Sequence, residues 1–355
     1  MQRATPILAI VLSLIIIALV HFGYMYYREE GTDASCRVVV KIPPGASLRQ
    51  VKDILVAEGL LNHPKLFRWA AYFSGREKDI KAGRYLFREG ESVAHILHKL
   101  IQGEIEYARV VIPEGYMANE IAGLLQDEIE IDSTVFMQMV FDSAVIRDFG
   151  FAGAPSLEGY LYPDTYLFNW PLETFEVVER IVHRFKEIFT DSMCALADSV
   201  GFSMNEAVTL ASIIQAEAVY DSEMRRISAV YHNRLRKGWR LEADPTVAFA
   251  KGGIRRKLWY KDLRVKSPYN TYRVRGLPPG PICSPGRAAL SAAVQPLEGC
   301  RDLYFVADGT GRHYFSRTLS DHVRAKESIR AGRRPSKPMD RCVEKVQETK
   351  EITAE

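Results

Sequence analysis

The stretch SMNEAVTLASIIQAEA, from Ser203 to Ala218, decides the fold of the largest part of this chain. Ser203 and Glu206 form an S-x-x-E capping box, which indicates that a helix begins here. One broad face of that helix is apolar, made by Ala207, Val208, Leu210, Ala211, Ile213 and Ile214. Because such a face has to be buried, we predict a core helix that ends near Ala218.

Other elements are predicted on both sides of this helix. A second helix starts at Asp221, carries an apolar stripe that includes Tyr231, and ends before Gly238. Beyond it lie stretches rich in Pro, Gly and Tyr, with a short strand at 303–306. Residues 133–200 are mostly helical, interrupted by an aromatic stretch at 158–166. The fold class is therefore mixed α+β.

A strand, a glycine turn and a capped helix follow one another three times before residue 130. The first copy has a β-rich run at 38–42, and Ser47 caps a helix whose apolar residues recur at helical spacing. The second full copy begins at 110–115, and a fainter one begins at 85–92. We predict a small α+β region over 38–130. The alternative is that strand, turn and helix simply follow one another here, as they do in many folds.

The N-terminal residues 7–27 are apolar and carry no charged side chain apart from His21. About 21 residues at ~1.5 Å each reach roughly 31 Å, the thickness of a bilayer core. A cleaved signal peptide would have a shorter apolar region, and this run ends in an aromatic belt, Tyr24 to Tyr27. Arg3 precedes it and acidic residues follow it, so residues 1–6 are expected in the cytoplasm. Everything after about residue 28, including the linker 28–37, is expected outside.

Composition excludes several functions. With a net charge of +3 over 355 residues and scattered Lys and Arg, nothing indicates nucleic-acid binding. We expect neither a metal nor an organic cofactor. The cysteines form no C-x-x-C pair, so we expect neither a zinc site nor a disulfide framework, although one incidental bridge stays open. They are Cys36, Cys194, Cys283, Cys300 and Cys342. Residues 333–355 are interpreted as a charged tail.

Glu217 is the candidate catalytic acid. Ile213 and Ile214 precede it by four and three positions, so its carboxyl leaves from the apolar face near the helix C-terminus. Burial and the negative end of the helix dipole both disfavour a carboxylate and raise its pKa. A glutamic acid that stays protonated near neutral pH is the proton donor that a glycosidic oxygen requires. The alternatives are that Glu217 is a surface residue or that it is half of an ion pair, with Arg225 as the partner.

Later segments carry the side chains by which proteins bind sugars. Aromatic rings stack on the C–H surfaces of sugars, while amides and carboxylates bond to their hydroxyls. The alternative is structural: a helix start at 244–246, a strand end at 269–272 and a rigid loop at 276–281. The candidate substrate-binding residues are Asn233, Arg234, Asp244, Thr246, Tyr269, Asn270, Thr271 and Tyr272.

Six ordered segments together resemble the endolytic murein transglycosylase family, also called MltG or YceG-like. They are ASIIQAEA at 211–218, YHNRL at 231–235, DPTV at 244–247, YNTY at 269–272, GLPPG at 276–280 and LYFVADG at 303–309. The likeness covers about residues 38–331 and includes EGY at 158–160 before PDTY at 163–166. Six motifs in order are far more specific than any one of them.

The resemblance implies a single-pass inner-membrane protein with a LysM-like region at 38–130 and a catalytic domain at 131–332, on the periplasmic side. It implies cleavage within nascent glycan strands of peptidoglycan, leaving 1,6-anhydro-N-acetylmuramic acid ends and limiting strand length. Glu217 matches the family's catalytic Glu. The biology of the family adds glycan synthases and division or elongation proteins as partners.

One position departs from the family pattern. Many relatives carry an acidic residue where this chain has Gln215, and we expect Gln215 to be a groove residue and Glu217 to suffice. Glu158 is expected to orient Glu217 or the sugar, with a structural role as the alternative. Two rival functions stay open: a non-catalytic wall-binding or assembly protein, and a lysozyme-like hydrolase that admits water to the same groove.

Overall fold

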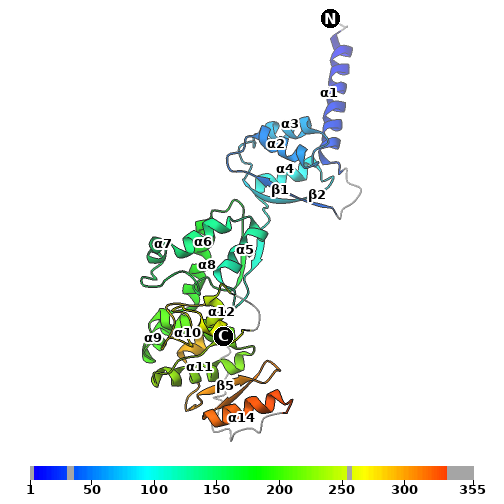
Figure 1. Ribbon diagram of the computed structural model, residues 1–355. Coiled ribbons are helices and arrows are strands. Elements are labelled where there is room, and N and C mark those ends of the chain that lie inside the picture. Colours follow the sequence, from blue (N-terminus) through cyan, green and yellow to red (C-terminus); the bar gives the residue numbers. More distant parts are fainter. Residues whose placement is uncertain (1–3, 30–35, 254–257, 334–355) are drawn as a thin grey trace, which may run out of the picture. The chain divides into compact units, whose positions relative to one another are not determined.

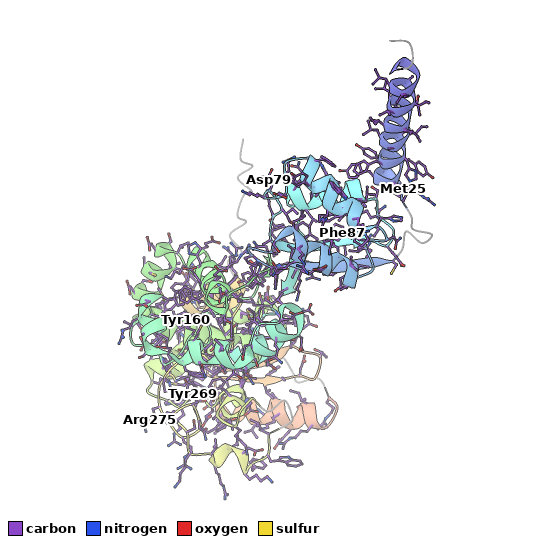
Figure 2. All side chains as sticks on the ribbon, turned by 90° about the horizontal axis from the view of Figure 1, so that it is seen from above. Met25, Asp79, Phe87, Tyr160, Tyr269 and Arg275 are labelled. Atoms are coloured by element: carbon purple, nitrogen blue, oxygen red, sulfur yellow. The ribbon has the colours of Figure 1, made fainter. Side chains whose placement is uncertain are left out.

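The computed structural model describes residues 4–29, 36–253 and 258–333, and the chain forms two compact units (Figure 1). Unit 1 contains the chain up to Val110 together with Leu167–Glu173. Unit 2 contains Val111–Tyr166 and the chain from Thr174 onward. Phe87 and Tyr160 are both fully buried and mark the two cores in Figure 2. Helices and small sheets occur together, so the predicted α+β class is confirmed.

Helix α1 (Ala4–Tyr27) begins unit 1 and agrees with the predicted membrane helix. Its segment Ile7–Tyr27 is long and apolar enough to cross a membrane. Apolar side chains from Ile7 to Val20 are exposed, as side chains that face lipid would be. Near the end of α1, Phe22 and Tyr26 pack against the core of unit 1. The predicted N-terminal segment 1–6 and linker 28–37 lie partly outside the described residues.

The rest of unit 1 is a two-stranded antiparallel sheet with helices. Strand β1 (Arg37–Ile42) pairs with β2 (Gly83–Arg88), so that Val40 lies opposite Tyr85. Ser47 and Ser92 cap the first and last of the helices through side-chain bonds to backbone N–H groups, as the sequence predicted for Ser47. The helices are α2 (Leu48–Ala57), α3 (Pro64–Phe73) and α4 (Val93–Gln102).

The copy that begins at 110–115 forms a strand, a turn and a helix as predicted, but its strand joins a different sheet. Strand β3 (Ala108–Val111) pairs with β4 (Thr165–Phe168), whereas β1 and β2, the strands of the other two copies, pair with each other. Helix α5 (Ala118–Ile129), which follows β3, lies in unit 2. Unit 1 closes at Val110, and the domain boundary at residue 130 stays a prediction.

Unit 2 is organised around α10 (Met204–Glu217). The Ser203 side chain accepts from the Glu206 N–H, and the Glu206 side chain accepts from the Ser203 N–H, so the predicted capping box is present. Side chains from Ala207 to Ile214 are buried on all faces, because α10 packs against α11 (Asp221–Arg236), α12 (Asp244–Ala250) and α13 (Arg287–Val294). The remaining elements are α6 (Ser133–Phe141), α7 (Ser143–Asp148), α8 (Thr174–Ile188), α9 (Asp191–Ser199), a short 3₁₀ turn (Asp262–Arg264), β5 (Tyr304–Ala307), β6 (His313–Ser316) and α14 (Leu319–Arg330).

The C-terminal part contains more structure than the sequence indicated. The predicted strand at 303–306 is β5, and it forms an antiparallel hairpin with β6, followed by α14. The predicted tail from 333 lies, apart from its first residue, outside the described residues, as does Cys342. No disulfide joins the cysteines that the structure describes, Cys36, Cys194, Cys283 and Cys300.

Comparing two glycines that share a backbone angle distinguishes the cost of close packing from the cost of backbone strain. Gly159 and Gly150 both have φ +81°, but a Cβ at Gly159 would lie 2.4 Å from Pro281 Cβ, whereas one at Gly150 meets nothing within 4 Å. We expect Gly150→Ala to cost about 1 kcal/mol from the left-handed backbone alone, and Gly159→Ala roughly 2–4 kcal/mol because overpacking adds to it. Urea denaturation of the chain in detergent measures both. Equal costs would contradict the close packing at Gly159.

Candidate active site

Glu217 is the last residue of α10, a helix in which every residue from Ala207 to Ile214 is buried. The chain leaves the helix at Ala218, whose N–H donates to the Ile214 carbonyl. The Glu217 side chain is enclosed by protein while keeping partial access to solvent. The sequence prediction that this carboxyl leaves from an apolar face agrees with the burial of Ile213 and Ile214.

Tyr231 of α11 holds the carboxyl of Glu217. Its hydroxyl donates to Glu217 Oε1 over 3.1 Å, and its ring is almost fully buried. The sequence analysis placed Tyr231 on an apolar stripe and assigned it no role. The available signal was the hydroxyl itself, because a tyrosine that is buried by a helix stripe needs a hydrogen-bond partner.

Asp244, the first residue of α12, supplies a second carboxyl group to this cluster. The Tyr272 hydroxyl donates to Asp244 Oδ1 over 2.6 Å. Burial, and after it the charge of Asp244, raise the pKa of Glu217 to about 7, against the hydrogen bond from Tyr231 and the charge of Arg234, which lower it. Glu217 therefore holds a proton at a pH where an ordinary glutamate has lost it.

Arg234 lies next to this cluster and fastens several loops. Its Nε donates to the Leu303 carbonyl over 2.8 Å, and its Nη1 donates to the Leu241 carbonyl over 2.8 Å. Nη1 also contacts Glu242 Oε2 at 3.2 Å. The guanidinium stands 5.3 Å from the centre of the Tyr304 ring. This fixed positive charge therefore connects α11, the segment before α12 and the start of β5.

The segment before α12 is strained and is held by threonine hydroxyls. Glu242 has φ +54°, which is unusual for a residue with a side chain. Its neighbour Ala243 donates from N to Thr271 Oγ1 over 3.0 Å, and Thr246 Oγ1 lies 2.9 Å from the same oxygen. Thr246 and Thr271 are fully buried. Together these bonds fix the segment that brings Asp244 and Tyr272 together.

Several predicted sugar-binding residues make internal bonds. Asn233 donates from Nδ2 to the Cys300 and Asp302 carbonyls, at 3.0 and 2.9 Å. Asn270 donates to two backbone carbonyls in the loop before it and accepts from the Tyr272 N–H. Both amides are buried. Asn233 therefore fixes the backbone before β5, and Asn270 fixes the backbone near Tyr272. Their role in binding sugar stays a prediction.

Gln215 and Glu158 lie apart from the Glu217 cluster. Two residues correspond to about 200° around a helix, so Gln215 leaves α10 on the other side from Glu217, and its Oε1 accepts from the Gly286 N–H over 2.9 Å. Glu158 is buried, with both carboxyl oxygens 3.1 Å from the N–H of Ala118 at the start of α5. Burial raises the pKa of Glu158 to about 8.

Tyr269 and Arg225 complete the account of the predicted positions. The centres of the Tyr269 and Phe249 rings lie 4.9 Å apart. Burial, and to a smaller extent the charge of Glu158, raise the pKa of the Tyr269 hydroxyl. Arg225, the alternative ion-pair partner of Glu217, donates instead to the Gln295 carbonyl over 3.0 Å. Within the described ranges, no three His, Cys, Asp or Glu side chains are grouped as a metal site would need.

These features define a class of protein: an α+β protein with an apolar N-terminal helix and a buried, protonatable carboxyl of the kind that performs acid–base chemistry. The sequence matches the YceG-like family over residues 40–328. The chain belongs to the YceG-like family, and the resemblance noted in the sequence is thereby confirmed.

Relatives with assigned names agree with this placement. The chain is 31% identical over 320 residues to the endolytic murein transglycosylase of Bacillus subtilis (strain 168), covering 86% of this chain and 88% of that protein. It is 28% identical over 341 residues to the protein of the same name from Streptococcus pneumoniae (strain D39), of which it spans 61%. The crystal structure of a putative YceG-like protein from Listeria monocytogenes has a TM-score of 0.59 and 31% identity, covering 81% of this chain and 98% of that one.

Substitutions of Asp244 and of Tyr231 are expected to shift the pH dependence of glycan cleavage in opposite directions. If protonated Glu217 is the acid, the rate falls as pH rises through its pKa. Asp244→Asn removes a negative charge, lowers that pKa and moves the fall to lower pH. Tyr231→Phe removes the hydrogen bond to the carboxylate, raises the pKa and moves the fall to higher pH. We expect each displacement to be roughly half to one pH unit.

Rates of glycan-strand cleavage between about pH 5 and 9 measure these displacements. Each variant will also be slower, but the position of the alkaline limb is independent of the maximal rate. If the alkaline limb moved in the same direction in Asp244→Asn and in Tyr231→Phe, the roles given to Asp244 and Tyr231 would be contradicted.

Proposed function

We propose that this protein is an endolytic peptidoglycan lytic transglycosylase. It cuts the bond between N-acetylmuramic acid and N-acetylglucosamine within glycan strands and leaves 1,6-anhydro-N-acetylmuramic acid ends. The observation that carries the proposal is the carboxyl of Glu217, whose pKa is raised to about 7 in a tyrosine-held, largely enclosed position. The names of the relatives, endolytic murein transglycosylases, support the same activity.

The first step is proton donation. Because Glu217 Oε1 accepts the Tyr231 hydroxyl, the acid proton belongs on Oε2, which gives it to the glycosidic oxygen as the bond from C1 to that oxygen breaks. Positive charge develops on the sugar at this point. The charge of Asp244 is close enough to raise the pKa of Glu217, and the same charge stabilises the developing cation electrostatically.

The second step returns the proton. The C6 hydroxyl of the same muramic acid attacks C1, and the Glu217 carboxylate takes the proton from that hydroxyl. One carboxyl thus serves as acid and then as base, and no water is consumed. The hydrogen bond from Tyr231 to Oε1 keeps the carboxyl in the same orientation for both proton transfers.

A hydrolase is the second candidate, and the position of Asp244 favours it. Glycoside hydrolases use a pair of carboxyl groups, the second of which activates water or attacks C1. Asp244 and Glu217 interact electrostatically, so the site contains two neighbouring carboxyl groups of the kind that such hydrolases use. We favour the transglycosylase because the relatives carry that name.

The remaining parts of the chain fit an enzyme of the cell wall. We propose that α1 anchors the chain in the cytoplasmic membrane, with both units on the periplasmic side, and that unit 1 acts as a LysM-like glycan-holding region. A hollow lined by Ser47 and Lys78, among others, lies between the turn after β1 and the loop before β2. Partners among glycan synthases and division or elongation proteins, and a role in limiting strand length, belong to the same proposal.

The masses of the products distinguish the candidate functions. The full chain in detergent is incubated with uncrosslinked glycan strands, and the fragments are analysed by mass spectrometry. Fragments lighter by one water than reducing-end fragments are expected from the transglycosylase. Reducing ends would establish the hydrolase, and binding without any cleavage would revive the non-catalytic assembly protein.

Glu217→Gln tests the acid directly. The amide is nearly the same shape but has no proton to donate, so we expect strand cleavage to fall roughly a hundredfold or more, with normal folding. Glu187→Gln, which changes an exposed carboxylate on α8, is the matched control and should keep full activity. Cleavage by the Glu217 variant at the rate of the control would remove this residue from the mechanism.

A further inference from the structure

Helix α3 carries an exposed aromatic face in unit 1. Phe67, Ala70 and Ala71 are its buried side, packed in the core of the unit. On the other side Trp69, Tyr72 and Phe73 are 47%, 63% and 70% exposed. The rings of Trp69 and Phe73 stack at 5.4 Å, so they form one continuous apolar surface. Large apolar surfaces of this kind are usually contact sites.

Cationic side chains border this face. Lys65 and Arg68 are exposed on the same helix, and α3 contains no acidic residue. Arg68 lies with Trp69 and Tyr72 in the lining of a hollow. The other residues of that lining are Leu48, Arg49 and Glu77. Aromatic rings together with Lys and Arg are the composition of protein segments that lie in the headgroup region of a membrane.

The position of α3 relative to the membrane helix decides which partner fits. Helix α3 contacts α1 directly and lies beside its C-terminal part (Figure 1). Phe22 and Tyr26 of α1 pack into the core to which Phe67 of α3 belongs, and Met25 marks this end of α1 in Figure 2. The rest of unit 1 therefore packs against the C-terminal end of the apolar span, and this contact leaves α3 at the level of the bilayer surface.

We infer that the aromatic face of α3 lies in the interface of the bilayer that α1 crosses. In this arrangement Trp69, Tyr72 and Phe73 enter between the headgroups, and Lys65 and Arg68 bind lipid phosphates. The membrane span and α3 form two adjacent contacts with the same leaflet. The sheet and helices that follow α1 in unit 1 are then fixed against the membrane surface instead of turning freely about α1. A glycan or protein ligand on this face would have to displace lipid, so the lipid surface is the partner that fits.

Quenching of tryptophan fluorescence by brominated lipids tests the inference. The full chain is reconstituted into vesicles of phosphatidylcholine and phosphatidylglycerol, with bromine placed on acyl carbons near the headgroups. Its tryptophans are Trp69, Trp170, Trp239 and Trp259. We expect partial quenching that Trp69→Phe largely abolishes. The phenyl ring preserves stacking on Phe73, and an exposed position tolerates the exchange.

Trp259→Phe is the matched control, because Trp259 is also well exposed, at 62%, but lies in unit 2. This variant should be quenched as strongly as the unchanged chain. Equal quenching of the Trp69→Phe variant and the unchanged chain would overturn the inference. So would a Trp69-dependent fluorescence change on adding soluble glycan strands in the absence of bromolipid quenching, because it would assign the face to glycan.

Discussion

The burial of one carboxyl group at the end of α10 is the constraint on which the site depends. Charging an enclosed carboxyl costs free energy, and raising the pKa of Glu217 from 4.5 to about 7 corresponds to something on the order of 3 kcal/mol between its two forms. Among the residues that the structure describes, no cationic side chain forms an ion pair with this carboxylate. The protein supplies one hydroxyl from Tyr231 and leaves Arg234 bonded to backbone carbonyls. The proton therefore remains available near neutral pH.

The surrounding scaffold fixes the groups that tune this carboxyl. Asp244 begins a short helix, and the strained Glu242 just before it is held by the Thr271 carbonyl and by Arg234. Strained backbone at such a place persists only where neighbouring bonds determine it fully. The buried threonine pair Thr246 and Thr271 supplies those bonds. A displacement of this segment would therefore change both the position of Asp244 and the acidity of Glu217.

Local patterns in the sequence predicted the elements well, and long-range contacts much less. The boxes and caps at Ser47 and Ser203 and the apolar segment of α1 depend on residues a few positions apart, so they are readable. Strand β3 pairs with β4, which lies more than fifty residues later along the chain. The similarity of the three strand-turn-helix copies therefore did not indicate that their strands pair differently. Strand β6 was missed because it is only four residues long, and α14 because its many charged residues hide a weak apolar pattern.

At the site, the sequence identified Glu217, Arg234, Asp244 and Tyr272 as candidates, and the structure brings these together. It missed Tyr231 as a partner of Glu217, because a contact between two helices has no fixed spacing. Asn233, Asn270, Thr246 and Thr271 make internal bonds, since amides and hydroxyls that suit sugars suit buried backbone equally well. Which of two polar roles a side chain takes depends on its exposure.

A direct titration of the Glu217 carboxyl tests the central claim most simply. Carbon-13 NMR of the chain labelled at glutamate carboxyls follows each group from about pH 4 to 9. A Glu158→Gln background removes the other described glutamate whose pKa is raised. The signal lost in a Glu217→Gln partner sample identifies the residue. This account predicts that it titrates near pH 7. Titration below about pH 5, as for an ordinary exposed glutamate, would contradict it.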